Sequence, residues 1–272
     1  MLTFLFWNVQ KKPILHRVAR ICEAHAVDVV ILAECEAKLS EVVASLNVDT
    51  ANRYVAPNAI AQRTKIVFRH SEMVHVELFN DSADRLAVRR LSFDGRSPVL
   101  LGVVHLPSPV SWTLDDRAAF VQHVAEDLRR IEDLERNRRT VLVGDFNMSP
   151  FDNALVGAYS FHALMTRELA ARKNNRLVQG IECRSFFNPM WQFLTDRNSR
   201  PAGTHYFESS TPINHFWHTY DQVLVRPELM DKLSKVEILD SDGVESFVKS
   251  DGRPDSGSSS SDHLPILFQL DL

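Results

Sequence analysis

Four short apolar runs carry polar side chains at their ends, and this pattern constrains the fold more than any other feature of the sequence. Three of the runs deliver Asn8, Glu34 and the pair Asp145 and Asn147, and the fourth follows Ser261-Asp262-His263. Apolar runs of this length are typical of buried strands. Side chains at the mouth of a packed sheet can meet in one pocket although they lie far apart in sequence. Carboxylates, amides and a histidine in one cleft are typical of a hard-cation site for phosphate chemistry.

Length and charge set broad limits on the class of protein. The chain has 272 residues, 44% of them hydrophobic, so it can bury a large core, and we expect a single domain over residues 1–272. It carries 31 Lys plus Arg against 35 Asp plus Glu, a net charge of −4. This balance argues against binding nucleic acid by bulk electrostatics but leaves a local basic groove open.

Cysteine usage and the hydropathy pattern indicate a compartment. Cys22, Cys35 and Cys183 have no CxxC spacing and are odd in number. Cys22 and Cys35 lie in apolar context, so we expect buried thiols in a reducing compartment. The N-terminal apolar run is too short for a signal segment, and no apolar stretch is long enough to span a bilayer. We therefore expect a cytoplasmic protein without membrane insertion.

Helix and strand patterns alternate at first and then become mostly strand. The periodicity predicts helices over residues 14–22, 39–46, 113–137 and 153–158. Thr113 is a good N-cap for the longest of them, because two aspartates follow it in the first turn. The alternating and continuous apolar runs predict strands over residues 2–7, 28–34, 65–69, 73–79, 86–93, 98–105, 140–145, 220–225 and 236–239.

Five irregular segments leave two interpretations open. Residues 251–261 have a composition that cannot bury itself, and we expect a mobile segment, either a flap or a solvated connector. Residues 186–191 are expected to form an exposed turn, either a substrate wall or a lid. The aromatic and histidine-rich segments 203–207 and 214–218 either stack a base or sugar or form a hairpin that packs its own aromatics. The arginine-bearing stretch 167–176 contacts a nucleic-acid backbone or is a solvated helix face.

The polar stations, taken in order, resemble those of the endonuclease/exonuclease/phosphatase superfamily. The stations are Asn8, Glu34, His105, Gly144-Asp145-Phe146-Asn147, Tyr220-Asp221 and Ser261-Asp262-His263. The resemblance spans positions 8 to 263. The superfamily includes pancreatic-type deoxyribonucleases, abasic-site endonucleases, neutral sphingomyelinases and inositol polyphosphate 5-phosphatases. It implies an α/β fold, a four-layer α/β/β/α sandwich of two mixed sheets with outer helices, and a site at one edge between the sheets.

The resemblance also implies a metal site. Glu34 is implied as the main Mg²⁺ ligand, with Asn8 and Asp262 nearby and Mn²⁺ as a possible replacement. A carboxylate directly after five apolar residues is costly unless it is paired or bound to a metal, which agrees with this role. The alternatives are a surface glutamate at a strand exit for Glu34 and a turn-forming residue for Asn8.

Four further residues are implied as catalytic. Asp145 would align or deprotonate the attacking water, and Asn147 would bind the phosphate. If the backbone is extended around Phe146, these two side chains point to the same side. His263 would hydrogen-bond the scissile phosphate, with Asp221 fixing its tautomer and charge from behind. The alternative for Asp145 is a turn that caps the helix near residue 153.

His105 directly follows the apolar run of residues 101–104. It matches a position at which deoxyribonuclease-like and sphingomyelinase-like members of the superfamily carry a histidine. Abasic-site endonucleases carry a tyrosine there. The match implies a phosphate contact or a general acid that protonates the leaving oxygen. The sequence offers no clear carboxylate partner for His105, and Asp84 is a weak candidate.

We therefore expect a divalent-metal-dependent phosphodiesterase, an endonuclease or exonuclease that hydrolyses DNA or RNA by in-line attack of water. The first alternative has the same chemistry and acts on a phospholipid or a small phosphorylated metabolite. The second is a catalytically idle binding domain. The net acidity favours the first alternative, whereas the stacking candidates and the predominance of arginine favour nucleic acid.

Overall fold

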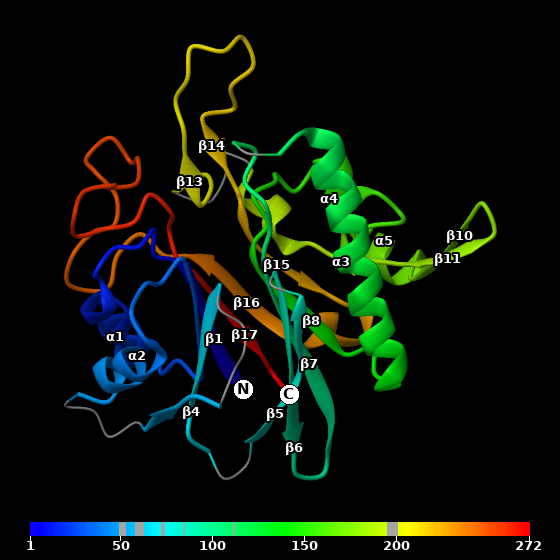
Figure 1. The fold of residues 1–272 in the computed structure, drawn as a ribbon, viewed down its shortest axis with the longest axis horizontal. Helices are drawn as coiled ribbons and strands as arrows, with labels where there is room; N and C mark the ends of the chain where they lie inside the picture. Colours follow the sequence, from blue (N-terminus) through cyan, green and yellow to red (C-terminus); the bar gives the residue numbers. More distant parts are fainter. Residues whose placement is uncertain (49–52, 58–62, 72–73, 84, 111, 195–200) are drawn as a thin grey trace.

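The computed structural model describes residues 1–48, 53–57, 63–71, 74–83, 85–110, 112–194 and 201–272. Two mixed β-sheets pack face to face, with helices on both outer sides (Figure 1). The chain therefore has the four-layer α/β sandwich that the resemblance implied. None of the helices in the described ranges is long and apolar enough to cross a membrane.

The first sheet has six strands and is built around the N-terminal strand. Its central strand β1 pairs parallel with β2 and antiparallel with β17, so both neighbours shield it. The strand order is β16 (Leu233–Ile238), β17 (Ile266–Leu270), β1 (Leu2–Asn8), β2 (Val29–Ala33), β4 (Thr64–Arg69), β3 (Tyr54–Val55).

The second sheet has seven strands and a parallel pair at its centre. β7 and β8 run parallel, and β15 runs antiparallel to β8. The strand order is β5 (Val74–Ala83), β6 (Leu86–Phe93), β7 (Arg96–His105), β8 (Thr140–Asp145), β15 (Asp221–Val225), β12 (Phe186–Phe187), β9 (Ala163–Leu164).

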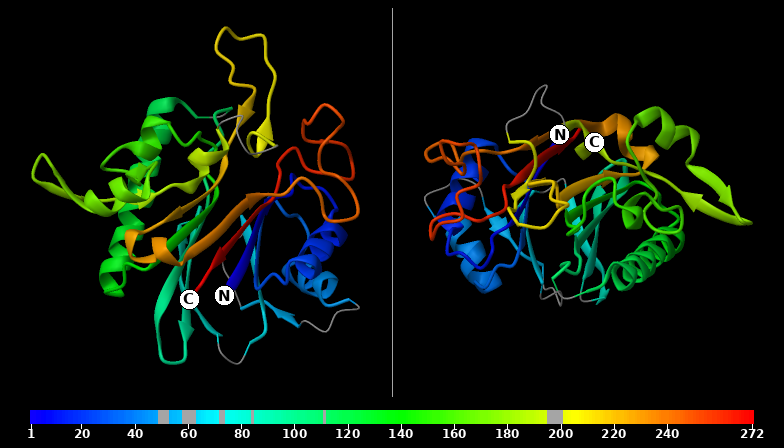
Figure 2. Two further views of the ribbon diagram at one scale, coloured as in Figure 1. Left: turned by 180° about the vertical axis from the view of Figure 1, so that it is seen from behind. Right: turned by 90° about the horizontal axis from the view of Figure 1, so that it is seen from above.

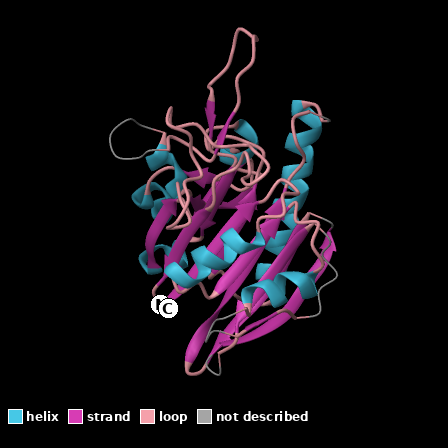
Figure 3. Ribbon diagram, turned by 90° about the vertical axis from the view of Figure 1, so that its left-hand side faces the viewer, coloured by secondary structure: helices cyan, strands magenta, loops and turns pink. Residues whose placement is uncertain are grey.

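The helices form the two outer layers, which Figure 2 shows from behind and from above and Figure 3 shows coloured by element type. The α1/α2 pair covers the six-stranded sheet, and α3 lies along the seven-stranded sheet. Short 3₁₀ turns, η1 (Pro189–Phe193) and η2 (Pro227–Lys232), follow β12 and β15. The helices are α1 (Leu15–Ala24), α2 (Leu39–Leu46), α3 (Leu114–Leu134), α4 (Asn153–Val156) and α5 (Arg167–Arg172).

Two hairpins project from this sandwich. One joins β10 (Asn175–Val178) to β11 (Ile181–Arg184), and the other joins β13 (His205–Tyr206) to β14 (Trp217–His218). The second hairpin, residues 205–218, rises above the ends of the sheets (Figure 1). It is made from the two aromatic and histidine-rich segments of the sequence.

The continuous apolar runs form central strands because they are buried on both faces. Every residue of β1 from Thr3 to Asn8 is buried, as is every residue of β2 and of β8. The helix boundaries agree with the sequence to within a few residues. Thr113 caps α3 as predicted, accepting a hydrogen bond from the backbone N–H of Asp116 at 3.2 Å. The helix ends at Leu134, three residues earlier than predicted. The predicted strand over 73–79 begins at residue 74 of the described chain.

The expectation that residues 251–261 have no means of burying themselves holds for most of the segment and fails at three positions. Pro254, Ser260 and Ser261 are buried, and the buried guanidinium of Arg17 donates to the carbonyl of Ser259 at 3.1 Å. The same guanidinium forms a 2.7 Å ion pair with Asp242. Arg17 on α1 therefore anchors this Gly/Ser-rich segment through a hydrogen bond to its backbone.

The expectation of an exposed turn over residues 186–191 was wrong. Phe186 and Phe187 form β12 inside the seven-stranded sheet, and both are buried. The Asn188 side chain donates to the buried Gln222 at 2.8 Å and accepts from the backbone N–H of Met190. The Asn188-Pro189 pair ends a buried strand here, rather than marking a surface loop, because Gln222 on the neighbouring strand accepts the hydrogen bond from the Asn188 amide.

Two smaller expectations have mixed outcomes. Cys22 is buried as expected and burial raises the pKa of its thiol to about 12, whereas Cys35 is only half-buried. All three cysteines lie in the described part of the chain, and each is free. In the 167–176 stretch, Arg167 donates to the carbonyls of Met230 and Leu233 and ties α5 to η2, which is a structural role.

Candidate active site

The sheet topology brings the polar stations to one end of the molecule. β1, β2, β7 and β8 all finish at this end, so Asn8, Glu34, His105 and Asp145 meet there. β15 and β17 run the opposite way and therefore begin there. Asp221 pairs directly with Asp145 across the two strands, and residues 261–263 immediately precede β17.

These side chains surround a cavity of about 410 Å³. Seven of the eight site residues expected from the sequence line it, and Asp221 lies behind them. No Lys or Arg occurs among the described residues of its wall, whereas three carboxylates do. The wall is formed by Asn8, Gln10, Glu34, His105, Ser108, Pro109, Val110, Asp145, Asn147, His205, Phe207, Tyr220, Asp262 and His263.

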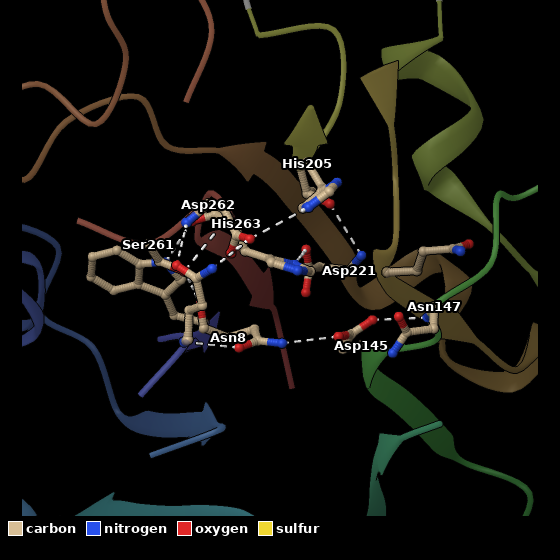
Figure 4. Close-up of polar contacts among 12 residues, drawn as sticks. Asn8, Asp145, Asn147, His205, Asp221, Ser261, Asp262 and His263 are labelled. Atoms are coloured by element: carbon tan, nitrogen blue, oxygen red, sulfur yellow. Dashed lines mark hydrogen bonds and ion pairs between the residues drawn. The ribbon is translucent and has the colours of Figure 1, made fainter. Parts of the chain in front are cut away.

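His263 is held by contacts on every side (Figure 4). Its Nδ1 lies 2.7 Å from Oδ2 of Asp221, which is fully buried. Its backbone N–H donates to Oγ of Ser261, and its carbonyl accepts from the indole of Trp7 at 2.8 Å. Ser261 in turn donates to the carbonyl of Asn8 at 2.7 Å. The ring therefore has one orientation, with Nδ1 toward Asp221 and its other edge toward the cavity.

Burial and neighbouring charges shift the pKa values of His263 and Asp145. Burial alone would lower the pKa of His263, but the carboxylates of Asp221, Asp145 and Asp262 outweigh it and raise the pKa to about 10. The ring is therefore an imidazolium at neutral pH. Burial, with the charge of Asp221, raises the pKa of Asp145 above its usual range, although His263 and His105 oppose the shift.

Asn8 joins two acidic side chains. Its Nδ2 donates to Oδ2 of Asp145 at 2.9 Å and lies 3.4 Å from Oε1 of Glu34, while its Oδ1 accepts from the backbone N–H of Gln10. Glu34 follows the last residue of β2 with a φ of 50°, a left-handed conformation that is uncommon outside glycine. Such strained backbone is often found at functional sites, where surrounding contacts maintain it.

The premise that Asp145 and Asn147 share one side of an extended segment was wrong. Asn147 has a φ of 52°, and its backbone N–H donates to Oδ1 of Asp145 at 2.8 Å, so the chain turns here. Both side chains line the cavity nevertheless. Gly144 is required just before the turn, because a Cβ there would lie 1.9 Å from the carbonyl oxygen of Val104.

His105 faces the same carboxylates. Its Nε2 lies 3.6 Å from Oε1 of Glu34 and 3.9 Å from Oδ2 of Asp145. These two carboxylates are the acidic neighbours that the sequence alone did not identify for His105. Asp84, the weak candidate, lies outside the described residues. The Nδ1 atom of His105 is buried and has no hydrogen-bond partner among the described residues.

Sequence reasoning assigned Gln10 no role in the site, and it indicated His205 only as part of the candidate stacking segment 203–207. Gln10 donates from Nε2 to Oδ2 of Asp262 at 2.7 Å, and Nε2 of His205 lies 3.6 Å from the same oxygen. The ring of His205 lies 4.7 Å from that of His263, and the two residues form a backbone bridge. Gln10 follows Asn8 by two residues, which was an available signal. His205 is placed by pairing between the hairpin and the 261–264 segment, which the sequence does not reveal.

The residues present fit a divalent cation. Glu34, Asp145 and Asp262 put three carboxylates on a wall without Lys or Arg, and Oδ1 of Asp262 is buried with no partner among the described residues. Potential ligand atoms of His205, Asp262 and His263 lie within 4.8 Å of one another. Glu34 instead lies beside Asn8 and His105. Carboxylate oxygens that have no other partner are the ligands that Mg²⁺ and Mn²⁺ prefer.

Solved structures of similar fold are numerous. An endonuclease/exonuclease/phosphatase family protein from Leptotrichia buccalis is 14% identical with a TM-score of 0.59, and an AP endonuclease from Archaeoglobus fulgidus is 14% identical with a TM-score of 0.53; in both, the alignment covers 100% of each chain. D. rerio TDP2 in complex with a single-strand DNA product is 16% identical with a TM-score of 0.56, over 100% of this chain and 99% of that one. At these identities the likeness shows the fold alone.

Sequence comparison identifies the family. The sequence matches none of the curated proteins. The sequence profile of the Endonuclease/Exonuclease/phosphatase family matches residues 5–263, from β1 to the histidine that faces the cavity. The chain belongs to the endonuclease/exonuclease/phosphatase family, whose members hydrolyse phosphoester bonds.

Proposed function

We propose that this protein is a divalent-metal-dependent phosphodiesterase that cleaves nucleic acid by in-line attack of water. One observation carries the proposal: a buried aspartate and a histidine held by a second buried aspartate face the same cavity as the carboxylates of Glu34 and Asp262. Such a cavity offers a base, a donor for phosphoryl oxygens and a cation site at once, which are the parts that hydrolysis of a phosphodiester needs.

Asp145 is the group that orients and deprotonates the attacking water. Its Oδ1 is used by the backbone N–H of Asn147 and its Oδ2 by Asn8, so the carboxylate cannot rotate. A buried carboxylate with a raised pKa is a stronger base than an ordinary one, which suits this step.

His263 and Asn147 stabilise the negative charge that develops on the phosphoryl oxygens. The Nε2 edge of His263 faces the cavity because Nδ1 is committed to Asp221. Donors fixed in place before the reaction stabilise a transition state without reorganisation at the moment of attack. Asn147 contributes as a second fixed donor, since its Nδ2 is already oriented toward the carbonyl of Leu106 at 3.0 Å.

Glu34 and Asp262, with Asn8 beside them, would hold Mg²⁺, or Mn²⁺ in its place. When bound, the cation would offset charge on the phosphoryl oxygens as a Lewis acid. His105 stands beside Glu34 and donates a proton to the leaving oxygen. No side chain is required to form a covalent intermediate.

Nucleic acid is proposed as the substrate because the relatives of similar fold include an AP endonuclease and a TDP2 crystallised with a single-strand DNA product. The test is metal-dependent cleavage of labelled single- and double-stranded DNA and RNA, with Asp145→Ala and His263→Ala as inactive variants. Phospholipid vesicles and inositol polyphosphates complete the panel.

Cleavage of a polynucleotide that needs added Mg²⁺ or Mn²⁺ and that both substitutions abolish would support the proposal. Cleavage of only a lipid or a small phosphate would retain the mechanism and overturn the substrate. If the folded protein binds the metal and cleaves nothing in the panel, the catalytic proposal fails, and the chain is better described as a binding domain.

A further inference from the structure

The hairpin of residues 205–218 presents one face to the cavity. His205 and Phe207 line the cavity, whereas Tyr206 between them does not. Tyr206 instead packs on Trp217, its partner across the hairpin, with ring centroids 5.5 Å apart. This alternation is that of a β-strand, in which every second side chain points the same way. His205 in β13 and Phe207 directly after this strand therefore both face whatever occupies the cavity.

Phe207 is unusually exposed for a residue of a cavity wall. Its side chain is 54% exposed, and Val110, on the segment that follows β7, lines the same cavity at 90% exposed. A large apolar side chain at the mouth of a polar site gains nothing in the free protein. Hydrophobic side chains in such positions are typical of ligand-binding surfaces.

The hairpin is braced, so Phe207 is held in place. Its backbone N–H donates to the carbonyl of Phe216 at 2.8 Å. On the other face of the hairpin, the guanidinium carbon of Arg253 lies 5.3 Å from the ring centroid of Tyr206. At the base of the hairpin, Thr204 accepts from the backbone N–H of Leu264 at 2.7 Å. The position of Phe207 relative to His263 is therefore fixed through the backbone.

We propose that Phe207, with Val110 beside it, forms a subsite that stacks an unpaired nucleobase next to the scissile phosphate. Two residues of strand separate Phe207 from His205 by about 7 Å, a distance on the scale of one nucleotide. A base on the nucleotide adjoining the cleaved bond would thus reach the ring of Phe207 while its phosphate lies near His263. This inference rests on the proposed phosphodiesterase function and names the class of substrate.

The charges of the site favour an unpaired strand over a duplex. Duplex binding draws most of its affinity from Lys and Arg side chains that neutralise several phosphates. The described wall of this cavity has none, and the chain is acidic overall. Stacking on an aromatic side chain adds affinity that does not come from charge, and it requires that the face of the base be free.

The test compares Phe207→Ala, Phe207→Tyr and the control Ile213→Ala, which lies at the exposed tip of the hairpin outside the cavity wall. Each variant is assayed on a short single-stranded oligonucleotide, on the same strand with abasic nucleotides on both sides of the cleaved bond, and on methyl p-nitrophenyl phosphate. Binding of the oligonucleotide in the presence of EDTA is followed separately by fluorescence anisotropy, because this measurement does not depend on cleavage.

We expect Phe207→Ala to lower kcat/KM on the single strand about 10-fold, the loss of one stacked base. On the abasic strand and on the small diester it should equal the unsubstituted protein. Phe207→Tyr and Ile213→Ala should remain near the original value throughout. The same pattern in oligonucleotide affinity, even without cleavage, would retain the subsite and reject the proposed catalysis.

Three results would overturn the inference. Equal losses for Phe207→Ala on the base-bearing and abasic strands would show that the ring does not stack a base. Faster cleavage of a duplex than of the single strand would show that pairing is not an obstacle. Cleavage of phospholipid vesicles that both Phe207→Ala and Ile213→Ala impair would show that the hairpin contacts a lipid surface instead.

Discussion

The candidate site has two halves that differ in how far their carboxylates are exposed to solvent. The buried half consists of Asp145, Asp221 and His263, and the open half consists of Glu34, Asp262 and His205. In the buried half the side chains of Asp145 and Asp221 are 2% and 0% exposed, and hydrogen bonds fix all three residues. In the open half the side chains of Glu34 and Asp262 are 33% and 27% exposed.

Because the two halves differ in exposure, we expect them to have different roles in the proposed reaction. Groups that are buried and already hydrogen-bonded can stabilise a transition state without moving, because their orientation was fixed when the protein folded. Groups that are about one-third exposed and incompletely paired suit a ligand that enters from solvent, such as a cation. Oδ1 of Asp262, although itself buried, has no partner among the described residues. The halves should therefore respond differently to substitution.

Removal of a group from the buried half should have the largest effect on turnover. Asp145→Asn keeps the shape of the side chain but removes the base, and His263→Gln removes the charged donor. We expect each to lower kcat by roughly 10²- to 10³-fold, the typical loss for one preorganised contact in a transition state. Metal affinity should change far less, and both quantities can be measured on the same preparation.

Asp94→Asn is the matched control, because Asp94 is exposed in the turn between β6 and β7, outside the cavity wall. It should leave kcat unchanged. A loss of metal affinity larger than the loss of kcat in Asp145→Asn would contradict the assignment of Asp145 to the buried half.

Substitution of the open half should act through the metal. Glu34→Gln and Asp262→Asn each remove one negative charge from the proposed cation site, so we expect the Kd for Mn²⁺ to rise by more than 10-fold. Isothermal titration calorimetry measures this directly. Saturating metal should also raise the Tm of the unsubstituted protein, because a ligand that binds only the folded state stabilises it. A metal-dependent Tm shift of full size in Asp262→Asn would remove Asp262 from the cation site.

The buried half could be predicted from the sequence, and the reason is physical. Asp145, Asp221 and His263 each lie at the boundary of a continuous apolar run, and such runs form central strands whose ends must meet at a sheet edge. The central strands and the main helices follow from the same patterns, whereas the four-layer arrangement was implied by the family resemblance. The pairing of β8 with β15 is sufficient to place Asp145 and Asp221 opposite each other.

The open half was only partly predictable, because its contacts depend on loops. His205 reaches Asp262 through a hairpin that pairs with the 261–264 segment, and no periodicity in either segment reveals this pairing. The 251–261 segment is tied to α1 by the hydrogen bond from Arg17 to the carbonyl of Ser259, more than 200 positions away. The exposed turn expected at residues 186–191 failed for a similar reason, since the amide of Gln222 satisfies Asn188 inside the sheet.

The two residues that flank Asp262 should have a smaller effect than the carboxylates themselves. Gln10 donates to Oδ2 of Asp262, and Nε2 of His205 lies 3.6 Å from the same oxygen, so both help to orient this carboxylate. We expect Gln10→Ala and His205→Ala each to raise the Kd for Mn²⁺ about 10-fold, the lower end of the range for partners of metal ligands. His205→Gln, which retains a donor, should lose less. Unchanged metal affinity in both alanine variants would show that Asp262 is oriented by its own backbone alone.

The smallest effect concerns stability and lies at the outer edge of the open half. Burial, with the charges of His205 and His215, lowers the pKa of the half-buried His218 to about 4. In the unfolded chain this ring titrates near its ordinary value of 6.5, so between about pH 6.5 and pH 4 the unfolded state binds a proton that the folded state does not. The free energy of unfolding therefore falls as the pH is lowered through this window.

His263 has the opposite sign, since its raised pKa gives stability that is complete below pH 6.5 and is lost as the pH rises toward 10. A comparison of Tm at pH 6.5 and pH 4.5 in the unsubstituted protein and in His218→Gln isolates the contribution of His218 to the pH dependence of stability. The substituted protein should lose less stability on acidification, by a modest amount because His218 is only half-buried. Identical slopes would mean that the hairpin opens to solvent before the ring is protonated, and the open half would then extend through the whole hairpin base.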